Sequence, residues 1–170
     1  MKLRKGSQDA TGLTFGIVAS KFNKFVTSRL LTECVKALTK AGVTDEAIEV
    51  VRVPARQLAR SGRFDAVICL GAVIRGDTPH FEYISTEVSR GILQASMDSN
   101  IPVIFGVLTT DTVAQAIERA DPEKLNRGAD VAKTAIEMVN VMRLLKKEGS
   151  GEAPQPATPS SAPTACPPAR

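Results

Sequence analysis

The sequence has no tryptophan, a single tyrosine and a single histidine, and aromatic residues make up only 4% of its 170 residues. So few rings argue against a surface on which the bases of single-stranded nucleic acid would stack. No apolar run approaches the roughly 18 residues of a membrane-spanning helix. The basic stretch 1–12 is not followed by an apolar segment either, so we expect no signal peptide and a cytoplasmic protein.

Patterns of metal ligands are also missing. The three cysteines, Cys34, Cys69 and Cys166, lack the close spacing of a metal site, and only one histidine could join them. Metal catalysis is therefore not expected. Cys34 and Cys69 lie within apolar patterns, which favours buried free thiols. The net charge of +4 comes from basic residues spread along the chain, which suits a small anionic substrate better than nucleic acid.

The composition changes abruptly near the C-terminus. Segment 149–170 holds six of the ten prolines among alanine, serine and threonine, with almost nothing to bury, which predicts a disordered tail. Residues 12–148 carry the apolar patterns of one folded domain. We expect residues 1–11 to form a flexible N-terminal arm.

Short apolar runs alternate with stretches of helical periodicity. Runs rich in valine and isoleucine predict strands at 13–20, 47–53, 65–74 and 102–109. They are apolar nearly throughout, which is typical of strands covered on both faces. Apolar residues spaced by three and four predict helices around 30–41, 83–95, 113–117 and 132–142. Gly42 is expected to end the first helix, and the cluster Thr109, Thr110 and Asp111 to cap the third.

This alternation predicts an α/β fold, a three-layer α/β/α sandwich with a four-stranded parallel, flavodoxin-like sheet. Such sheets bind ligands beyond the carboxyl ends of their strands. One connection is unusually short, since only the eleven residues 54–64 separate the second and third strands. A crossover with its helix needs at least about ten to twelve residues. The link therefore leaves no room for a functional loop.

The stretch "RGDTPH" (75–80) follows the third strand and precedes a helix. Backbone N–H groups of Gly76, Asp77 and Thr78, with the positive end of that helix, can bind a phosphate, and Thr78 adds a hydroxyl. An ordinary helix cap by Asp77 or Thr78 fits the pattern equally well. His80 follows directly, and an imidazole with a reference pKa near 6.5 suits proton transfer at neutral pH. A purely structural histidine is the alternative.

Three further residues are candidates for substrate contacts. Arg119 and Arg127 flank a break between two helices, where a guanidinium can hold phosphate bidentately. A solvated helix end is the commoner role of such arginines. Phe22 follows the first strand in "SKFN", which places its ring to stack on a flat heterocycle. A core phenylalanine is the alternative there.

Four stretches run in order from about residue 12 to 145: "GIVASKFN", "FDAVICLGAVIRGDTPHFEYISTEVSRGI", "PVIFGVLTTDTVAQAIERA" and "NRGADVAKTAIEMVN". Together they resemble the 6,7-dimethyl-8-ribityllumazine synthases, penultimate enzymes of riboflavin biosynthesis. The resemblance implies condensation of 5-amino-6-(D-ribitylamino)uracil with 3,4-dihydroxy-2-butanone 4-phosphate, releasing phosphate and water, without cofactor or metal. It also implies a homopentamer or an icosahedral shell of twelve pentamers, with no nucleic-acid or membrane partner.

The resemblance also assigns roles to particular positions. His80 matches the proton-transfer histidine of the family, and Arg119 matches its phosphate-binding arginine. Asp77 and Thr78 match the turn that takes the phosphate, and Phe22 matches the ring that stacks on the pyrimidine. The positions that match the lining of the uracil pocket are Ala72, Val73, Ile74 and Phe105, the last usually reaching in from a neighbouring subunit.

Two departures from the family pattern stand out. Arg127 occupies a substrate-binding position where the family usually has lysine, so the charge is kept but the shape is not. After Pro54, about eight residues of a Gly-Ala-Phe-Glu-Ile-Pro type segment are absent, and that loop contacts the ribityl chain and the uracil in the family. An alternative is therefore a shell-forming or flavin-binding relative with impaired activity. A further alternative is a flavodoxin-like module that binds nucleotides or nucleic acid, which only the sheet type and the mild basicity support.

Overall fold

The computed structural model describes residues 1, 3–52 and 54–149. Along the chain lie β1 (Phe15–Ala19), α1 (Lys24–Lys40), the 3₁₀ turn η1 (Asp45–Ala47), β2 (Ile48–Val51), α2 (Ala55–Arg60), β3 (Ala66–Ile74), α3 (His80–Ser99), β4 (Val103–Thr110), α4 (Val113–Ala120) and α5 (Arg127–Gly149). Every predicted strand and helix is present. The short helix α2 was not predicted as an element.

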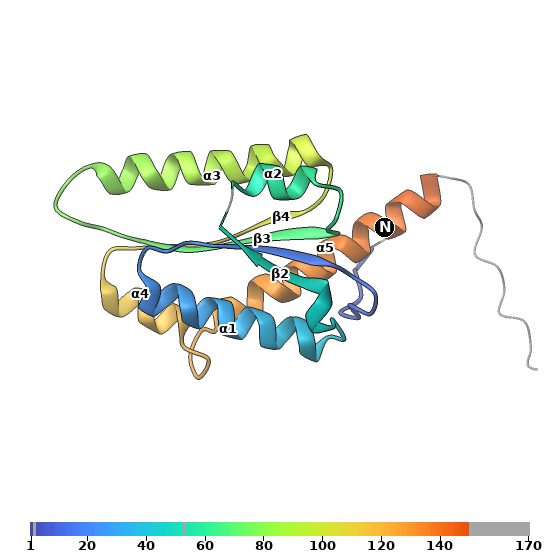
Figure 1. Cartoon of the computed structure of the whole chain (residues 1–170), viewed down its shortest axis with the longest axis horizontal. Helices are drawn as coiled ribbons and strands as arrows, with labels where there is room; N and C mark the ends of the chain where they lie inside the picture. Colours follow the sequence, from blue (N-terminus) through green and yellow to red (C-terminus); the bar gives the residue numbers. More distant parts are fainter. Residues whose placement is uncertain (2, 53, 150–170) are drawn as a thin grey trace, which may run out of the picture.

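The four strands form one parallel sheet in the order β2-β1-β3-β4. Phe15 of β1 lies opposite Ile48 of β2 and Ala66 of β3, and Val67 of β3 lies opposite Val103 of β4. Figure 1 shows α2 and α3 on one face of this sheet and α1 and α4, with α5 beside them, on the other. The predicted three-layer α/β/α fold is confirmed.

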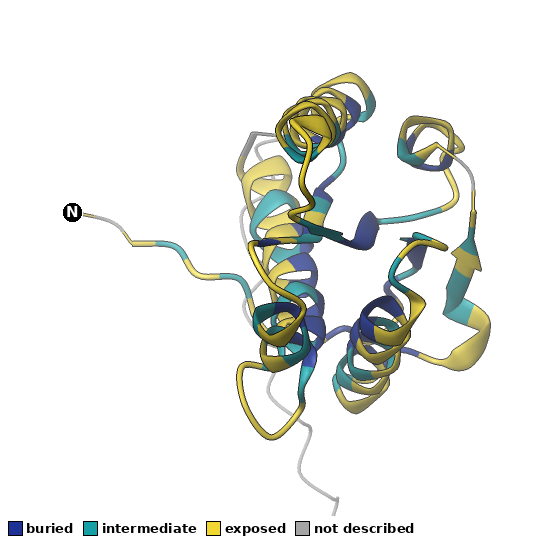
Figure 2. Cartoon of the chain, turned by 90° about the vertical axis from the view of Figure 1, so that its left-hand side faces the viewer, coloured by how far each residue is buried: buried dark blue, intermediate teal, exposed yellow. Residues whose placement is uncertain are grey.

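Burial on both faces explains why the strands are apolar throughout. Along β3, Ile68 and Leu70 belong to the core shared with α1 and α5, whereas Val67 and Cys69 belong to the core beneath α2 and α3. Successive side chains of a strand point to opposite faces, so both sets must be apolar when both faces are covered. Figure 2 shows the buried residues along the sheet and on the inner sides of the helices.

The ends of α1 are set by residues with left-handed backbone. Asn23, with φ of 49°, turns the chain from β1 into α1, so the helix starts earlier than its apolar pattern indicates. Gly42, with φ of 100°, follows the helix as predicted, in a conformation that glycine adopts without strain. At the start of α5, a Cβ on Gly128 would lie 2.5 Å from the carbonyl oxygen of Leu30. A glycine there allows α5 to approach α1 closely.

The cap of α4 differs from the prediction. The N-cap is Thr112, not Thr109, Thr110 or Asp111, and its hydroxyl oxygen accepts a hydrogen bond from the backbone N–H of Gln115 at 3.2 Å. The side-chain oxygen of Gln115 in turn accepts from the backbone N–H of Asp111 at 2.9 Å. The Thr-x-x-Gln spacing of a capping box would have identified Thr112 from the sequence.

The short crossover is occupied by α2. Leu58 is buried and passes over β1 at Gly16, where a Cβ would lie 2.7 Å from Leu58 Cδ2. Arg56 Nε donates to Asp98 Oδ2 of α3 at 2.6 Å, which joins the two helices of this layer. The link thus returns to the sheet through a helix of six residues. Pro54 is the N-cap of that helix, which begins at the next residue.

Residues 3–10 run beside α5. Asn140 Nδ2 donates to the carbonyls of Ser7 and Asp9, each at 2.9 Å, and Ala10 is fully buried. Helix α5 extends to residue 149, and most of the predicted tail, 150–170, falls outside the described residues together with Cys166. The flexible arm, the domain limits and the disordered tail stay predictions. None of the helices in the described ranges is long and apolar enough to cross a membrane.

Candidate active site

A cavity of about 740 Å³ opens between α3 and the carboxyl ends of β1 and β3. Its wall also includes the loop from β1 to α1 and the residues Pro54 and Ala55 at the start of α2. Open parallel sheets bind ligands at this end of their strands. A largely apolar cavity with a few polar groups is the usual form of a small-molecule site. Five predicted site residues line it: Phe22, Ala72, Val73, Ile74 and His80.

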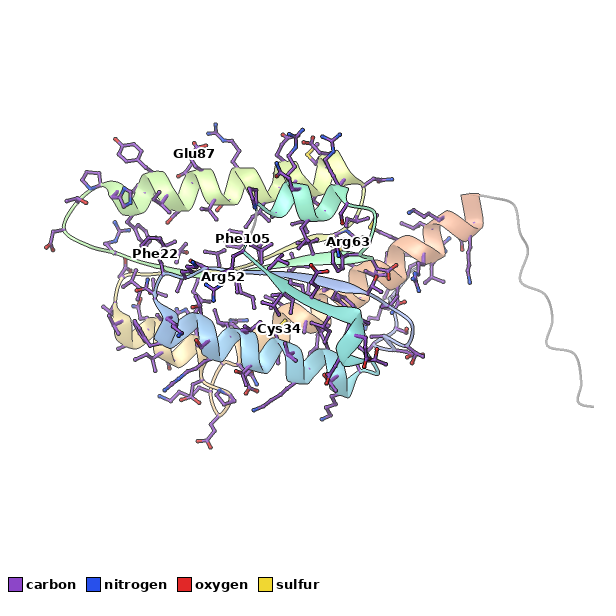
Figure 3. The ribbon with its side chains drawn as sticks, in the orientation of Figure 1. Phe22, Cys34, Arg52, Arg63, Glu87 and Phe105 are labelled. Carbon is purple, nitrogen blue, oxygen red and sulfur yellow. The ribbon has the colours of Figure 1, made fainter. Side chains whose placement is uncertain are left out.

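Phe22 lies where β1 leads into α1 (Figure 3), and the residue is 81% exposed. The alternative of a core phenylalanine is therefore wrong. Its backbone N–H donates to Ser20 Oγ at 3.1 Å, and Asn23 Nδ2 donates to the carbonyl of Ala72 at 2.9 Å. The first bond lies within the loop, and the second holds the loop against β3. The aromatic ring is left free to stack on a flat ligand.

His80 is the first residue of α3 and lines the same cavity. The residue is exposed, and within the described part of the chain its imidazole forms no hydrogen bond or ion pair. Both ring nitrogens of His80 are thus available to a bound ligand.

The turn between β3 and α3 is open to solvent and extends past the end of the sheet (Figure 1). A Cβ on Gly76 would meet no atom within 4 Å. Among the described residues, the backbone N–H groups of Gly76, Asp77 and Thr78 donate no hydrogen bond. The side chains of Asp77 and Thr78 form no hydrogen bond there either. The N-cap of α3 is Pro79, without a side-chain bond, so a capping role of Asp77 or Thr78 is wrong. The free N–H groups suit an anion.

The other predicted residues lie away from this cavity. Phe105 is 41% exposed on β4, an edge strand of the sheet. Arg119 lies in the last turn of α4, and its Nη1 donates to a carbonyl of its own helix at 3.1 Å. Arg127 begins α5 and pairs with Asp130 at 3.2 Å. Because α4 and α5 cover the face opposite α3 (Figure 1), a single chain does not bring either arginine to His80.

Part of the cavity wall was not predicted. Asn23 fixes the loop that carries Phe22, and its signal was an asparagine between a strand and a helix in "SKFN". Cys69 also contributes, and burial raises the pKa of its thiol to about 12, so it is a neutral group near pH 7. The remaining apolar side chains follow the core pattern, which does not distinguish a cavity wall from packed core: Val18, Leu70, Ile84, Val88, Ile92 and Val107.

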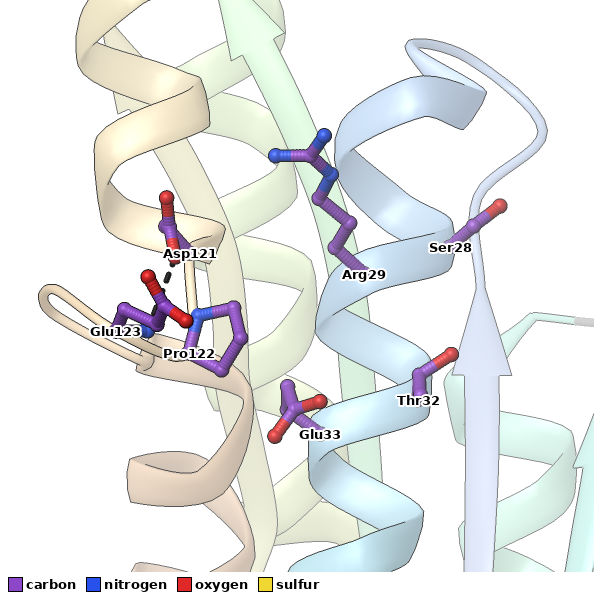
Figure 4. Close-up of a pocket in the computed structure, with 7 residues that line it drawn as sticks. All are labelled: Ser28, Arg29, Thr32, Glu33, Asp121, Pro122 and Glu123. Atoms are coloured by element: carbon purple, nitrogen blue, oxygen red, sulfur yellow. Dashed lines mark hydrogen bonds between the residues drawn. The ribbon is translucent and has the colours of Figure 1, made fainter.

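A second, shallower cleft of about 490 Å³ lies between α1 and the link from α4 to α5 (Figure 4). Its lining residues mix both charges: Ser28, Arg29, Thr32, Glu33, Asp121, Pro122 and Glu123. The backbone N–H of Glu123 donates to Asp121 Oδ1 at 2.9 Å, which shapes the link itself. Within residues 1, 3–52 and 54–149, no group of three or more His, Cys, Asp or Glu residues lies close enough to hold a metal ion.

A sequence model described as "6,7-dimethyl-8-ribityllumazine synthase" matches residues 12–143, almost the whole of the folded part. The chain belongs to the 6,7-dimethyl-8-ribityllumazine synthase family. A curated protein named 6,7-dimethyl-8-ribityllumazine synthase, from Syntrophus aciditrophicus, is 55% identical over 147 residues, covering 82% of this chain and 96% of that protein. The resemblance read from the sequence motifs is confirmed.

The comparison with this lumazine synthase also bears on the short crossover. The aligned region is 147 residues long but takes in only 82% of the 170-residue chain, so it includes positions that this chain lacks. The sequence pattern places the shortening after Pro54, and both Pro54 and Ala55 line the cavity. The shortened crossover therefore borders the same cavity as Phe22 and His80.

Proposed function

We propose that this chain catalyses the condensation of 5-amino-6-(D-ribitylamino)uracil with 3,4-dihydroxy-2-butanone 4-phosphate to 6,7-dimethyl-8-ribityllumazine, the penultimate step of riboflavin biosynthesis. The observation that carries the proposal is one cavity in which Phe22, β3 residues 72–74 and His80 meet, in a chain of the lumazine synthase family. The similarity to a named synthase favours a transferase over a flavin-binding or shell-forming relative with impaired activity.

The cavity suits one substrate, and the turn 76–78 that follows β3 suits the phosphate of the other. The ring of Phe22 stacks on the pyrimidine, while residues 72–74 line the pocket for its edge. The phosphate of the second substrate binds to the free N–H groups of Gly76, Asp77 and Thr78, with the hydroxyl of Thr78 as a further donor. The carboxylate of Asp77 must point away from that phosphate, which its exposed position permits.

The chemistry consists of two condensations around one elimination. The 5-amino nitrogen attacks the ketone carbon, and water leaves to give an imine. Loss of phosphate and of a proton from the adjacent carbon gives an enol, which becomes a ketone. The ribityl-bearing nitrogen then closes the ring on that ketone, and a second water leaves. His80 carries protons between these nitrogen, carbon and oxygen atoms, a role that typically contributes about 10²–10⁴-fold in rate. Holding both substrates together contributes at least as much.

We further propose that the chain acts as a homo-oligomer, a pentamer or an icosahedral shell of twelve pentamers, in which Phe105, Arg119 and Arg127 serve a neighbouring cavity. Two observations support this. These three residues lie away from the cavity of their own chain, and no lysine or arginine is found among the described residues that line it. An arginine or lysine beside the substrate phosphate would strengthen its binding through charge-assisted hydrogen bonds. The cytoplasmic location expected from the sequence stays a prediction.

The test combines the purified protein with both substrates and follows the lumazine chromophore together with inorganic phosphate. We expect one phosphate per lumazine and a rate that rises with protein concentration above the uncatalysed reaction. Tight binding of riboflavin without formation of lumazine would instead support the binding relative. Neither product nor binding would overturn the proposal.

A further inference from the structure

Arg75 lies at the junction of three elements. Its backbone N–H donates to the carbonyl of Thr110 at the end of β4, at 2.9 Å. Its Nε donates to Asp111 Oδ1, just before α4, at 2.7 Å, and its Nη1 donates to the carboxylate of Glu82 in the first turn of α3. Its guanidinium carbon also stands 4.2 Å from the centroid of the Phe81 ring. One side chain thus joins the ends of β3 and β4 to the start of α3.

These contacts engage two of the three guanidinium nitrogens and one face of the group. Two carboxylates accept from it, and an aromatic ring covers it at cation–π distance. The hydrogen bond to Asp111, followed in size by the one to Glu82, raises the pKa of Arg75. The bond from Arg75 lowers the pKa of Glu82. Both groups are therefore charged at neutral pH. The charge of Arg75 is thus already paired with two carboxylates. Its contacts are with the framework of the site.

The turn that Arg75 brackets has little else to hold it. Arg75 precedes Gly76–Pro79, and its partners Phe81 and Glu82 follow the same residues on α3. Between these points the turn is exposed, and the side chains of Asp77 and Thr78 have no partner within the described chain. His80 lies in the same bracketed segment. The contacts of Arg75 thus fix both ends of segment 76–80, the start through Arg75 itself and the end through Phe81 and Glu82.

We propose that Arg75 is a positioning residue for the proposed condensation: it holds the turn 76–79 and His80 in the geometry that binds the phosphate and presents the imidazole. The inference rests on the proposed function. It assigns to Arg75 an effect on the phosphate-bearing substrate that an ordinary surface ion pair does not have.

The link from Arg75 continues into α4. Asp111 accepts from Arg75 and donates its backbone N–H to the side chain of Gln115, whose backbone N–H is bonded to the Thr112 cap. The carbonyl of Gln115 accepts from Arg119. Arg75 therefore holds the turn of its own cavity and the helix that carries the predicted phosphate arginine in one hydrogen-bonded network.

The test compares Arg75→Met with Arg75→Lys and with the control Arg90→Met. Arg90 is an exposed arginine of α3 that pairs with Glu87 at 3.5 Å, well outside the turn. For Arg75→Met we expect the KM for the butanone phosphate and the inhibition constant of inorganic phosphate to rise at least tenfold. The KM for the ribitylaminouracil should stay within twofold of the unaltered protein. Arg75→Lys keeps one point charge, so its constants for phosphate should lie between those of the unaltered protein and those of Arg75→Met. Arg90→Met should match the unaltered protein.

Binding of inorganic phosphate is also measured by calorimetry without turnover, so that the two proposals fail separately. Absence of turnover in the unaltered protein would overturn the proposed function, while the ratio of phosphate affinities still tests Arg75. The inference is overturned if Arg75→Met binds phosphate as the unaltered protein does, or if both substrates lose affinity equally. It is also overturned if lysine is no better than methionine. Melting temperature and particle mass should be unchanged, because exposed ion pairs contribute little to folding.

Discussion

The imidazole of His80 is exposed at the cavity, and its contribution is expected in rate and not in binding. His80→Ala should lower kcat by about 10- to 1,000-fold while both KM values stay within about threefold, because a proton shuttle acts on the transition state. Steady-state kinetics with both substrates varied gives these constants. Since no partner of His80 was found in the described chain, its removal should leave particle mass and melting temperature unchanged. Unfolding or disassembly would make His80 structural.

The side chain of Arg119 bonds only to a carbonyl of its own helix within the described chain, so the guanidinium keeps donors for a ligand. Arg119→Ala should raise the KM for the butanone phosphate at least tenfold and leave the KM for the ribitylaminouracil within twofold, because a charge-assisted phosphate contact is lost. Arg90→Ala removes an exposed arginine elsewhere and serves as the control for net charge. Equal effects on the two substrates would indicate a general role in folding.

Two buried thiols make stability depend on alkaline pH. Burial raises the pKa of Cys34 and of Cys69 from 9.0 to about 12. The folded protein then keeps protons that the unfolded chain releases, so the contribution is full below about pH 9 and is lost as pH rises toward 12. The free energy of unfolding in urea should therefore fall more steeply between pH 9 and 11 in the unaltered protein than in Cys69→Ala. Equal slopes would contradict the buried thiol.

Residue types at strand ends were enough to place Phe22 and His80 at one cavity, and the turn 76–78 between β3 and α3, while their roles stay predictions. The sequence motif did not predict that Arg119 and Arg127 lie across the sheet from His80. That separation depends on which face of the sheet each helix covers, a tertiary property that linear spacing does not encode. Arg75 was missed for a related reason, since its partners Glu82 and Asp111 meet only when α3 and the end of β4 come together.

Among the elements, the link between β2 and β3 differs most from the family pattern. The turn 76–78 does not depend on it, so inorganic phosphate should bind. Lost hydrogen bonds of roughly 1–3 kcal/mol each should weaken ribityl ligands, and two or three of them amount to about a hundredfold. A Gly-Ala-Phe-Glu-Ile-Pro type insert between Pro54 and Ala55 should therefore tighten riboflavin binding about a hundredfold, as followed by fluorescence titration.

A glycine–serine insert of equal length is the control for this change, because it restores length without the side chains. Neither insert should change the inhibition constant of inorganic phosphate. Tight riboflavin binding by the unaltered chain would show that another segment replaces the missing loop.

Strands and long helices could be predicted because burial on two faces leaves apolar runs, and burial on one side leaves a period of three to four. The features that were not predicted are a short helix and a helix start that depends on a single residue. Six-residue α2 has little intrinsic helical stability and is held by Leu58 over Gly16, a contact between distant parts of the sequence. The start of α1 depends on the left-handed Asn23, which no hydrophobic pattern reveals.

For the whole molecule, large apolar side chains remain on the surface of a single chain. Among them are residues of both outer strands and of the helices α3 and α5: Val50, Phe105, Leu93, Met97, Leu144 and Leu145. Light scattering of the purified protein is expected to give a mass five or sixty times that of one chain, because association removes such surface from water. A Phe105→Glu variant should shift the protein toward smaller species. A monomer in the unaltered protein would contradict the proposed oligomer.

Helix α1 packs against α5, so the first helix to leave the ribosome finds its packing partner only when the last helix has been made. Leu30, Cys34 and Leu38 of α1 are buried in a core that includes Ala132 and Ile136 of α5. About 100 residues must be added between them, which takes on the order of 5–20 s at ordinary rates of synthesis. During that interval the apolar side of α1 is without its cover. Chains released before residue 127 are therefore expected to aggregate or bind chaperones and not to form a smaller folded domain.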